Sequence, residues 1–248
     1  MKVRILSAAF GLLLAVLAAP VKADQIHVAV AANFNEPARE IAELFRKKTH
    51  HKVILITGSS GAFYTQITHG APFEVFLSAD EERPRMAIEN GFAVQDSRFT
   101  YAIGKLVLWS RVVDVTNGEE VLKAANFRKL SIANPTAAPY GAAAVETMKA
   151  LSVWDALQPK LVQGSSIAQA FQFIDTRNAE LGFIALAQLN GVKGGMRWIV
   201  PDKLHSPILQ DAVLLKKGAD NKAAKAFLAF LKGPEARAVI ERFGYGIE

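Results

Sequence analysis

The sequence of 248 residues contains no cysteine, which excludes disulfides and thiolate metal sites. It also excludes the lipid-modified cysteine that would tether an exported protein to a membrane. The five histidines show no metal-ligand spacing, and lysine and arginine form no block typical of a nucleic-acid surface. We therefore expect no nucleic-acid partner and no resident metal or cofactor.

The sequence has a single long apolar run, and it stands at the N-terminus. Lys2 and Arg4 precede the run at 5–19, and small residues follow it up to Ala23. This pattern is typical of a secretory signal peptide, and the run is too short to span a membrane comfortably. We predict a signal peptide of residues 1–23, cleaved after Ala23, and export of a soluble protein to the periplasm. A retained membrane anchor is the alternative interpretation.

Removing the signal peptide takes away three basic residues and no acidic ones, so the net charge falls from +6 to +3. The mature chain is thus only weakly basic, which again argues against a nucleic-acid partner. Because 51% of the sequence is apolar, the remaining residues can form one large or two modest cores.

Short apolar runs alternate with helix-like runs along the mature chain, which predicts an α/β fold. The expected strands lie at 26–31, 53–56, 75–77, 106–109, 130–133, 160–162, 181–185 and 207–215. The expected helices lie at 37–47, 142–151, 222–230 and 234–243. We predict mostly parallel sheets in two lobes, with lobe 1 formed by 24–103 and 207–248 and lobe 2 by 104–206. Two crossover segments near 101–105 and 206–210 would act as a hinge.

The most informative motif is Thr57-Gly58-Ser59-Ser60-Gly61, where an apolar strand stops and a helix begins. The N–H groups in the first turn of a helix have no intrahelical partner and carry the positive end of the helix dipole. With two serine hydroxyls beside them, they would form a neutral cradle for an anion. The alternative is that Ser59 or Ser60 merely caps the helix.

Two further helix starts carry similar signals. Pro139 stands near one of them, and we expect the amides of Tyr140 and Gly141 to be free donors there. The segment 164–167 contains a second Gly-Ser-Ser helix start. Because strand ends and helix starts share one edge of such sheets, we expect these two starts to meet the serine motif in one crevice.

Five strings of residues, spread over the mature chain, carry a family resemblance. They are Ala-Ala-Asn-Phe at 31–34, Gly-Ser-Ser-Gly at 58–61, Gly-Ala-Pro-Phe-Glu-Val-Phe-Leu-Ser-Ala-Asp at 70–80, Leu-Gly-Phe-Ile-Ala at 181–185 and Leu-Lys-Gly-Pro at 231–234. The chain is similar to the periplasmic molybdate-binding proteins of ABC transporters. The resemblance implies a type II periplasmic-binding fold without enzymatic activity, which closes on molybdate or tungstate as a monomer and delivers the ligand to a permease.

The resemblance also implies which residues surround the anion. Carried over position by position, they are Asn33 with Ala32 beside it, Ser60 with Ser59 beside it, Tyr140, and Ile167 through its backbone N–H. Asn33, Ser60, Tyr140 and Ile167 would meet the metal only through the oxygens of the oxyanion, without direct ligation.

The chain departs from the commoner family pattern in two places. Many members have serine where Asn33 stands and a tyrosine where Ala185 stands. Ala185 has no side-chain donor, and Tyr140 offers a replacement phenol. The chain therefore resembles the family's less common Asn/Tyr variant.

A site built only of hydrogen-bond donors suits an unprotonated dianion, whereas a partly protonated phosphate would need an acceptor carboxylate. Sulfate or thiosulfate is the closer alternative ligand, and the sequence does not rank molybdate against tungstate. An exported serine hydrolase with Ser60 or Ser166 as nucleophile is a remote alternative. Neither serine stands in a Gly-x-Ser-x-Gly or Ser-x-x-Lys motif, and neither has a plausible histidine partner.

Overall fold

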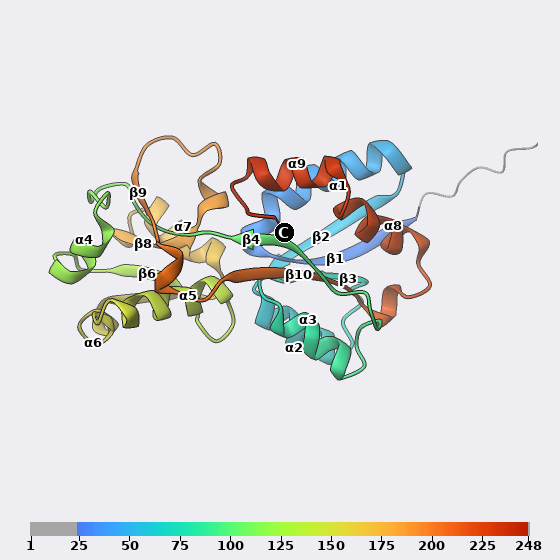
Figure 1. The fold of residues 1–248 in the computed structure, drawn as a ribbon, viewed down its shortest axis with the longest axis horizontal. Helices are drawn as coiled ribbons and strands as arrows, with labels where there is room; N and C mark the ends of the chain where they lie inside the picture. The colour runs from blue at the N-terminus through green and yellow to red at the C-terminus, as the bar shows by residue number, and fades with distance from the viewer. Residues whose placement is uncertain (1–23, 248) are drawn as a thin grey trace, which may run out of the picture.

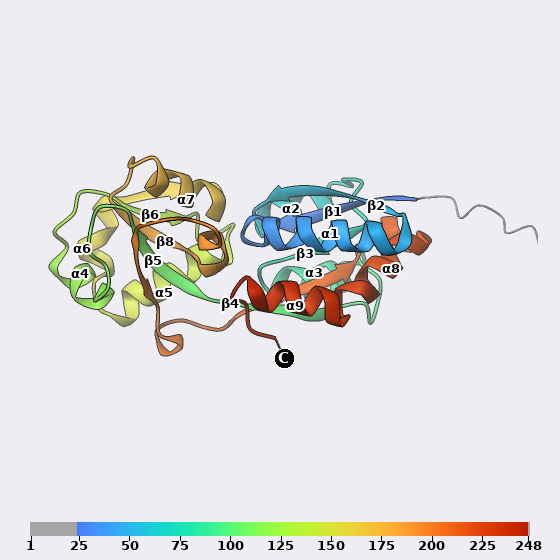
Figure 2. The same ribbon diagram turned by 90° about the horizontal axis from the view of Figure 1, so that it is seen from above.

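The computed structural model describes residues 24–247, and the predicted signal peptide lies outside these residues. Two lobes, each built on its own sheet, lie end to end and are joined by the segments that carry β4 and β10 (Figures 1 and 2). The predicted two-lobed α/β fold is therefore confirmed. Within residues 24–247, no helix combines the length and the apolar character needed to cross a membrane.

Each lobe contains a five-stranded sheet. The lobe 1 sheet has the order β2-β1-β3-β10-β4, and the lobe 2 sheet has the order β7-β6-β8-β5-β9. The strands of lobe 1 are β1 (Gln25–Ala31), β2 (Lys52–Gly58), β3 (Val75–Leu77), β4 (Phe99–Gly104) and β10 (Ile208–Leu214). The strands of lobe 2 are β5 (Leu106–Ser110), β6 (Leu130–Ala133), β7 (Leu161–Gly164), β8 (Leu181–Ala185) and β9 (Met196–Ile199).

Both sheets are mixed. The prediction of parallel pairing holds for three neighbouring strands in each, namely β2, β1 and β3 in lobe 1 and β7, β6 and β8 in lobe 2. The remaining strands pair antiparallel to their neighbours. Strands β10 and β5, which lie next to the points where the chain passes between the lobes, run opposite to the parallel strands, and their outer neighbours β4 and β9 run in the same direction as the parallel strands.

Helices cover the faces of both sheets. In lobe 1, α1, α8 and α9 pack on one face and α2 and α3 on the other (Figure 1). The helices are α1 (Asn35–Thr49), α2 (Ser60–Thr68), α3 (Glu82–Glu89), α4 (Gly118–Ala124), α5 (Pro139–Ala150), α6 (Trp154–Leu157), α7 (Ile167–Asp175), α8 (Lys222–Leu231) and α9 (Pro234–Arg242). Short 3-10 helices are η1 (Ala32–Phe34), η2 (Gln158–Lys160), η3 (Leu186–Leu189), η4 (Asp202–Leu204) and η5 (Lys216–Gly218).

The two connections between the lobes lie next to each other. Strand β4 ends at Gly104 and β5 begins at Leu106, so a single residue separates the two sheets at the first connection. On the return, Ile208 at the start of β10 pairs with Gly104. The C-terminal segment joins them, because Gly246 forms a bridge with Ile103 of β4 (Figure 1). Three chain segments therefore meet where the lobes are joined.

Candidate functional site

A small cavity lies between the lobes, where helix starts from both lobes face each other. About 200 Å³ of space, part of it open to solvent, lies between the atoms of its lining. Its lining is Ala31, Ala32, Asn33, Gly58, Ser59, Ser60, Ala79, Ala138, Pro139, Tyr140 and Ile167. All six residues predicted from the family resemblance are in this lining. None of the eleven carries a charge.

Ser60 is the first residue of α2, and its side chain is almost completely buried. The interpretation that Ser59 or Ser60 merely caps this helix is wrong, because α2 begins without any side-chain cap. Instead, the Ser60 hydroxyl oxygen accepts a hydrogen bond of 2.9 Å from the backbone N–H of Ala79. A hydroxyl has one proton and two acceptor positions, so the Ser60 proton is available to an anion in the cavity.

Tyr140 lies in the first turn of α5, behind Pro139, and its ring is buried. The hydroxyl oxygen accepts a hydrogen bond of 3.1 Å from Nε2 of Gln210. Burial, followed by the neighbouring phenols of Tyr245 and Tyr101, raises the pKa of Tyr140 well above its usual value. The phenol therefore remains protonated at neutral pH and can act as a donor.

The expectation that both Tyr140 and Gly141 offer free amides is wrong for Gly141. Its N–H donates to the carbonyl of Ala138 at 2.9 Å. This bond tightens the first turn of α5 in the manner of a 3-10 helix, which uses an amide that an α-helical start would leave free. The donors that this loop can present are the hydroxyl and the N–H of Tyr140.

Asn33 lies in η1, directly after β1, with Ala32 beside it. Its side-chain amide donates to Oε1 of Gln210 at 2.8 Å and to the hydroxyl of Tyr245 at 3.0 Å. An NH₂ group has only two protons, so both are used within the protein. The side chain of Asn33 thus fixes the loop, and the loop can face an anion with its backbone N–H groups.

Ile167 is the first residue of α7, and its backbone N–H has no intrahelical partner. The preceding residue, Ser166, caps the helix by accepting from the N–H of Gln169. Ser166 lies outside the cavity lining, which contains no histidine or carboxylate. These features contradict the hydrolase alternative, because neither Ser166 nor Ser60 has a general base within the cavity.

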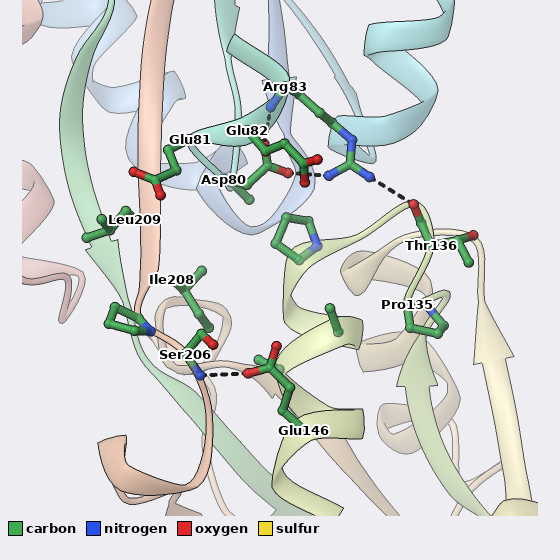
Figure 3. A pocket seen from close by; sticks show the side chains of 15 residues that line it. Asp80, Glu81, Glu82, Arg83, Pro135, Thr136, Glu146, Ser206, Ile208 and Leu209 are labelled. Atoms are coloured by element: carbon green, nitrogen blue, oxygen red, sulfur yellow. Dashed lines mark hydrogen bonds and ion pairs between the residues drawn. The ribbon is translucent and has the colours of Figure 1, made fainter. Parts of the chain in front are cut away.

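The lobes are closed on each other in this structure. The N–H of Gly61 at the start of α2 donates to the carbonyl of Ala137 in lobe 2 at 2.9 Å. Arg83 of α3 donates to the carbonyl of Thr136 at 2.8 Å while it also pairs with Asp80 (Figure 3). Both bonds join a lobe 1 helix to a backbone carbonyl of lobe 2, so they can form only when the lobes approach.

A larger hollow of about 920 Å³ opens next to the cavity (Figure 3). Its lining includes four carboxylates, those of Asp80, Glu81, Glu82 and Glu146, against the single guanidinium of Arg83. An excess of negative charge opposes an anionic ligand. The neutral cavity, and not this larger hollow, is therefore the candidate site for an oxyanion. Among residues 24–247, no group of three or more histidine, aspartate and glutamate side chains could hold a metal ion.

A buried polar cluster, formed by Gln210, Tyr101 and Tyr245, lies behind the cavity and was not predicted from the sequence. Gln210 is completely buried and bonds to both Asn33 and Tyr140. The sequence did contain one indication of Gln210, because it is an uncharged polar residue within the apolar run that forms β10. Tyr245 carried no such signal, because it follows the last helix and comes to the site only through the fold.

A neutral cavity enclosed between two α/β lobes defines a two-lobed binding protein for a small oxyanion. The chain belongs to the family of bacterial extracellular solute-binding proteins, and the match to this family covers residues 26–246. Members of this family are transport proteins and not enzymes.

Individual relatives are similar over nearly their whole length. The chain is 54% identical to the molybdate-binding protein ModA of Rhodobacter capsulatus, over 94% of this chain and 92% of that protein. It is 52% identical to ModA of Azotobacter vinelandii, over 94% of each. The solved structure of the Azotobacter vinelandii periplasmic molybdate-binding protein superimposes with a TM-score of 0.86 at 40% identity, covering 90% of this chain and 99% of that one.

Proposed function

We propose that this protein captures molybdate or tungstate between its two lobes and delivers the anion to the permease of an ABC transporter. One observation carries the proposal: a small cavity between the lobes, with a lining that holds hydroxyl and N–H donors but no charged side chain. The names of the highly similar relatives agree with this ligand. We further propose periplasmic location after cleavage behind Ala23, a monomeric state, and lobe boundaries at 103/104 and 206/207.

The proposed ligand contacts are six of the eleven residues of the cavity lining. They are Ala32, Asn33, Ser59, Ser60, Tyr140 and Ile167, each acting on the oxygens of the anion and none on the metal. Helix starts and amide dipoles oppose the negative charge, so no cation has to be buried. Six or seven charge-assisted bonds of about 1.5 kcal/mol give roughly 10 kcal/mol before closure costs, which corresponds to an affinity between micromolar and nanomolar.

We expect molybdate and tungstate to raise the melting temperature of the mature protein, while sulfate, thiosulfate and phosphate at equal ionic strength do not. A ligand that binds only the folded protein stabilises it by about 4 kcal/mol at a thousandfold excess over Kd. For a chain of this size the shift is on the order of 10 °C. Differential scanning fluorimetry with this panel measures it. Equal shifts with sulfate would assign the site to another oxyanion, and no shift with any anion would contradict the proposed function.

We expect molybdate to reduce the radius of gyration measured by small-angle X-ray scattering. The proposed contacts come from both lobes, so the anion stabilises the closed arrangement more than an open one. Sulfate at the same ionic strength is the control for screening of the surface charges. An identical radius with and without saturating molybdate would contradict closure on the ligand.

A further inference from the structure

Gln210 lies in an unusual place for a polar side chain. It is in β10, one of the two strands next to the interlobe connections, and it is completely buried. Gly104 of the neighbouring strand makes room for it, because a Cβ at Gly104 would come within 2.8 Å of the Gln210 Nε2 atom. A buried amide carries a free-energy cost unless its hydrogen bonds are made, so the bonds of this side chain define its role.

The two ends of the Gln210 amide bond to site residues of different lobes. Oε1 accepts from Nδ2 of Asn33 at 2.8 Å, and Asn33 belongs to the first loop of lobe 1. Nε2 donates to the hydroxyl of Tyr140 at 3.1 Å, and Tyr140 belongs to α5 of lobe 2. Tyr101 completes the environment, because its hydroxyl lies 3.2 Å from Oε1 while it also donates to the carbonyl of Ser78.

The C-terminal segment reinforces one side of this arrangement. The hydroxyl of Tyr245 donates to the carbonyl of Asn33 at 2.8 Å and accepts from its side-chain amide at 3.0 Å. The Tyr245 ring also packs edge-on against Phe34, with the ring centroids 5.4 Å apart. Asn33 is thus held by Tyr245 on one side and by Gln210 on the other.

We propose that Gln210 is a positioning residue for anion binding. From β10, at the connection between the lobes, it fixes the positions of the first loop of lobe 1 and of Tyr140 in lobe 2. This inference rests on the proposed function. By donating to the Tyr140 oxygen, Gln210 occupies an acceptor position and directs the phenol proton away from itself, toward Tyr245 or an anion in the cavity. By accepting from Asn33, it fixes the loop whose backbone N–H groups line the same cavity. Gln210 itself is not part of the cavity lining.

The test is a double-mutant cycle between Gln210→Met and Tyr140→Phe, read by calorimetry with molybdate. Met keeps the length of the side chain and removes both hydrogen bonds. We expect each single variant to weaken binding about 10- to 100-fold. Because Gln210 acts through the Tyr140 hydroxyl, we expect the double variant to lie within about fivefold of the weaker single variant. If the affinity losses of the two single variants multiplied in the double variant, the proposal would be overturned. The same holds if Gln210→Met bound molybdate within twofold of the parent.

Ser110→Ala is the matched control. It removes another buried hydroxyl, which donates to the carbonyl of Glu180 and lies in β5, outside the cavity lining and without a bond to Gln210. We expect it to lower the melting temperature of the ligand-free protein and to change molybdate affinity less than threefold. If it weakened binding as much as Gln210→Met does, the effect would be general loss of packing and the positioning role would be wrong.

Two cases need a further measurement: a Gln210→Met variant that does not fold, and a parent protein that does not bind molybdate. If Gln210→Met does not fold, Gln210→Glu replaces it, because a carboxylate keeps the size but draws the Tyr140 proton away from the anion. Parental affinity in Gln210→Glu would overturn the proposal. If the parent binds a different oxyanion, the cycle is run with that anion; if the parent binds none, the proposed function fails and this inference fails with it.

Discussion

The Ser60→Asp substitution is expected to abolish molybdate binding, with the affinity falling by about a thousandfold or more. Ser60 lies at the start of α2 with its hydroxyl in a cavity that contains no cation. A carboxylate there faces the dianion at short range, and like charges in contact cost several kcal/mol. Isothermal titration calorimetry measures the loss, and Ser60→Ala should give an intermediate weakening of about 10- to 100-fold, since it only removes one donor.

Thr57→Asp is the control for the added charge. Thr57 is in the same strand as Gly58, three residues before Ser60, but it is exposed and outside the cavity lining. We expect its affinity to stay within threefold of the parent, because solvent screens a charge at the surface. Equal losses in Thr57→Asp and Ser60→Asp would show that net charge alone decides binding, which would contradict the assigned site.

The Gly104→Ala substitution is expected to weaken molybdate binding by about 100-fold although Gly104 does not line the cavity. A Cβ at this position would lie 2.2 Å from the Tyr140 hydroxyl oxygen and 2.8 Å from Nε2 of Gln210. Both side chains are buried, so they cannot turn away into solvent. Tyr140 has to shift, and a donor displaced by about 1 Å loses most of its hydrogen bond. The strain should also lower the free energy of unfolding by about 1–3 kcal/mol.

Gly118→Ala is the control for steric strain at a position away from the cavity. A Cβ at Gly118 in α4 would lie 2.3 Å from the ring of Trp198, within lobe 2 and outside the cavity lining. We expect a comparable loss of stability in chemical denaturation and unchanged affinity. An affinity loss in Gly118→Ala equal to that in Gly104→Ala would mean that binding follows overall stability, and the steric account of Gly104 would then be wrong.

The fold was largely predictable because its strands are short apolar runs bounded by turn residues. The expected strands at 75–77, 130–133 and 181–185 coincide with β3, β6 and β8. Strands β4 and β9 were not predicted. The segment Phe99–Gly104 mixes polar and apolar residues, and Met196–Ile199 lies at a sheet edge where alternate side chains are exposed. Both strands are stabilised by pairing with distant strands, which a local pattern does not contain.

The cavity lining was predictable to the extent that it consists of helix starts. Ser60 and Ile167 stand at strand-to-helix turns, which the sequence marks with glycine and serine. The bonding of each group was not predictable. The amide of Asn33 is used by Gln210 and Tyr245, and the N–H of Gly141 by Ala138, because tertiary contacts and the pitch of a first turn decide these partners.

Asn33 and Tyr245 are 212 positions apart, yet they share two hydrogen bonds. A ribosome makes Asn33 long before Tyr245, so the loop lacks one of its two supports until Tyr245 has been synthesised. All five strands of lobe 2, by contrast, come from one continuous stretch of chain, which is synthesised before Tyr245. A chain that lacks Tyr245 therefore has a complete second lobe and a first loop held by Gln210 alone.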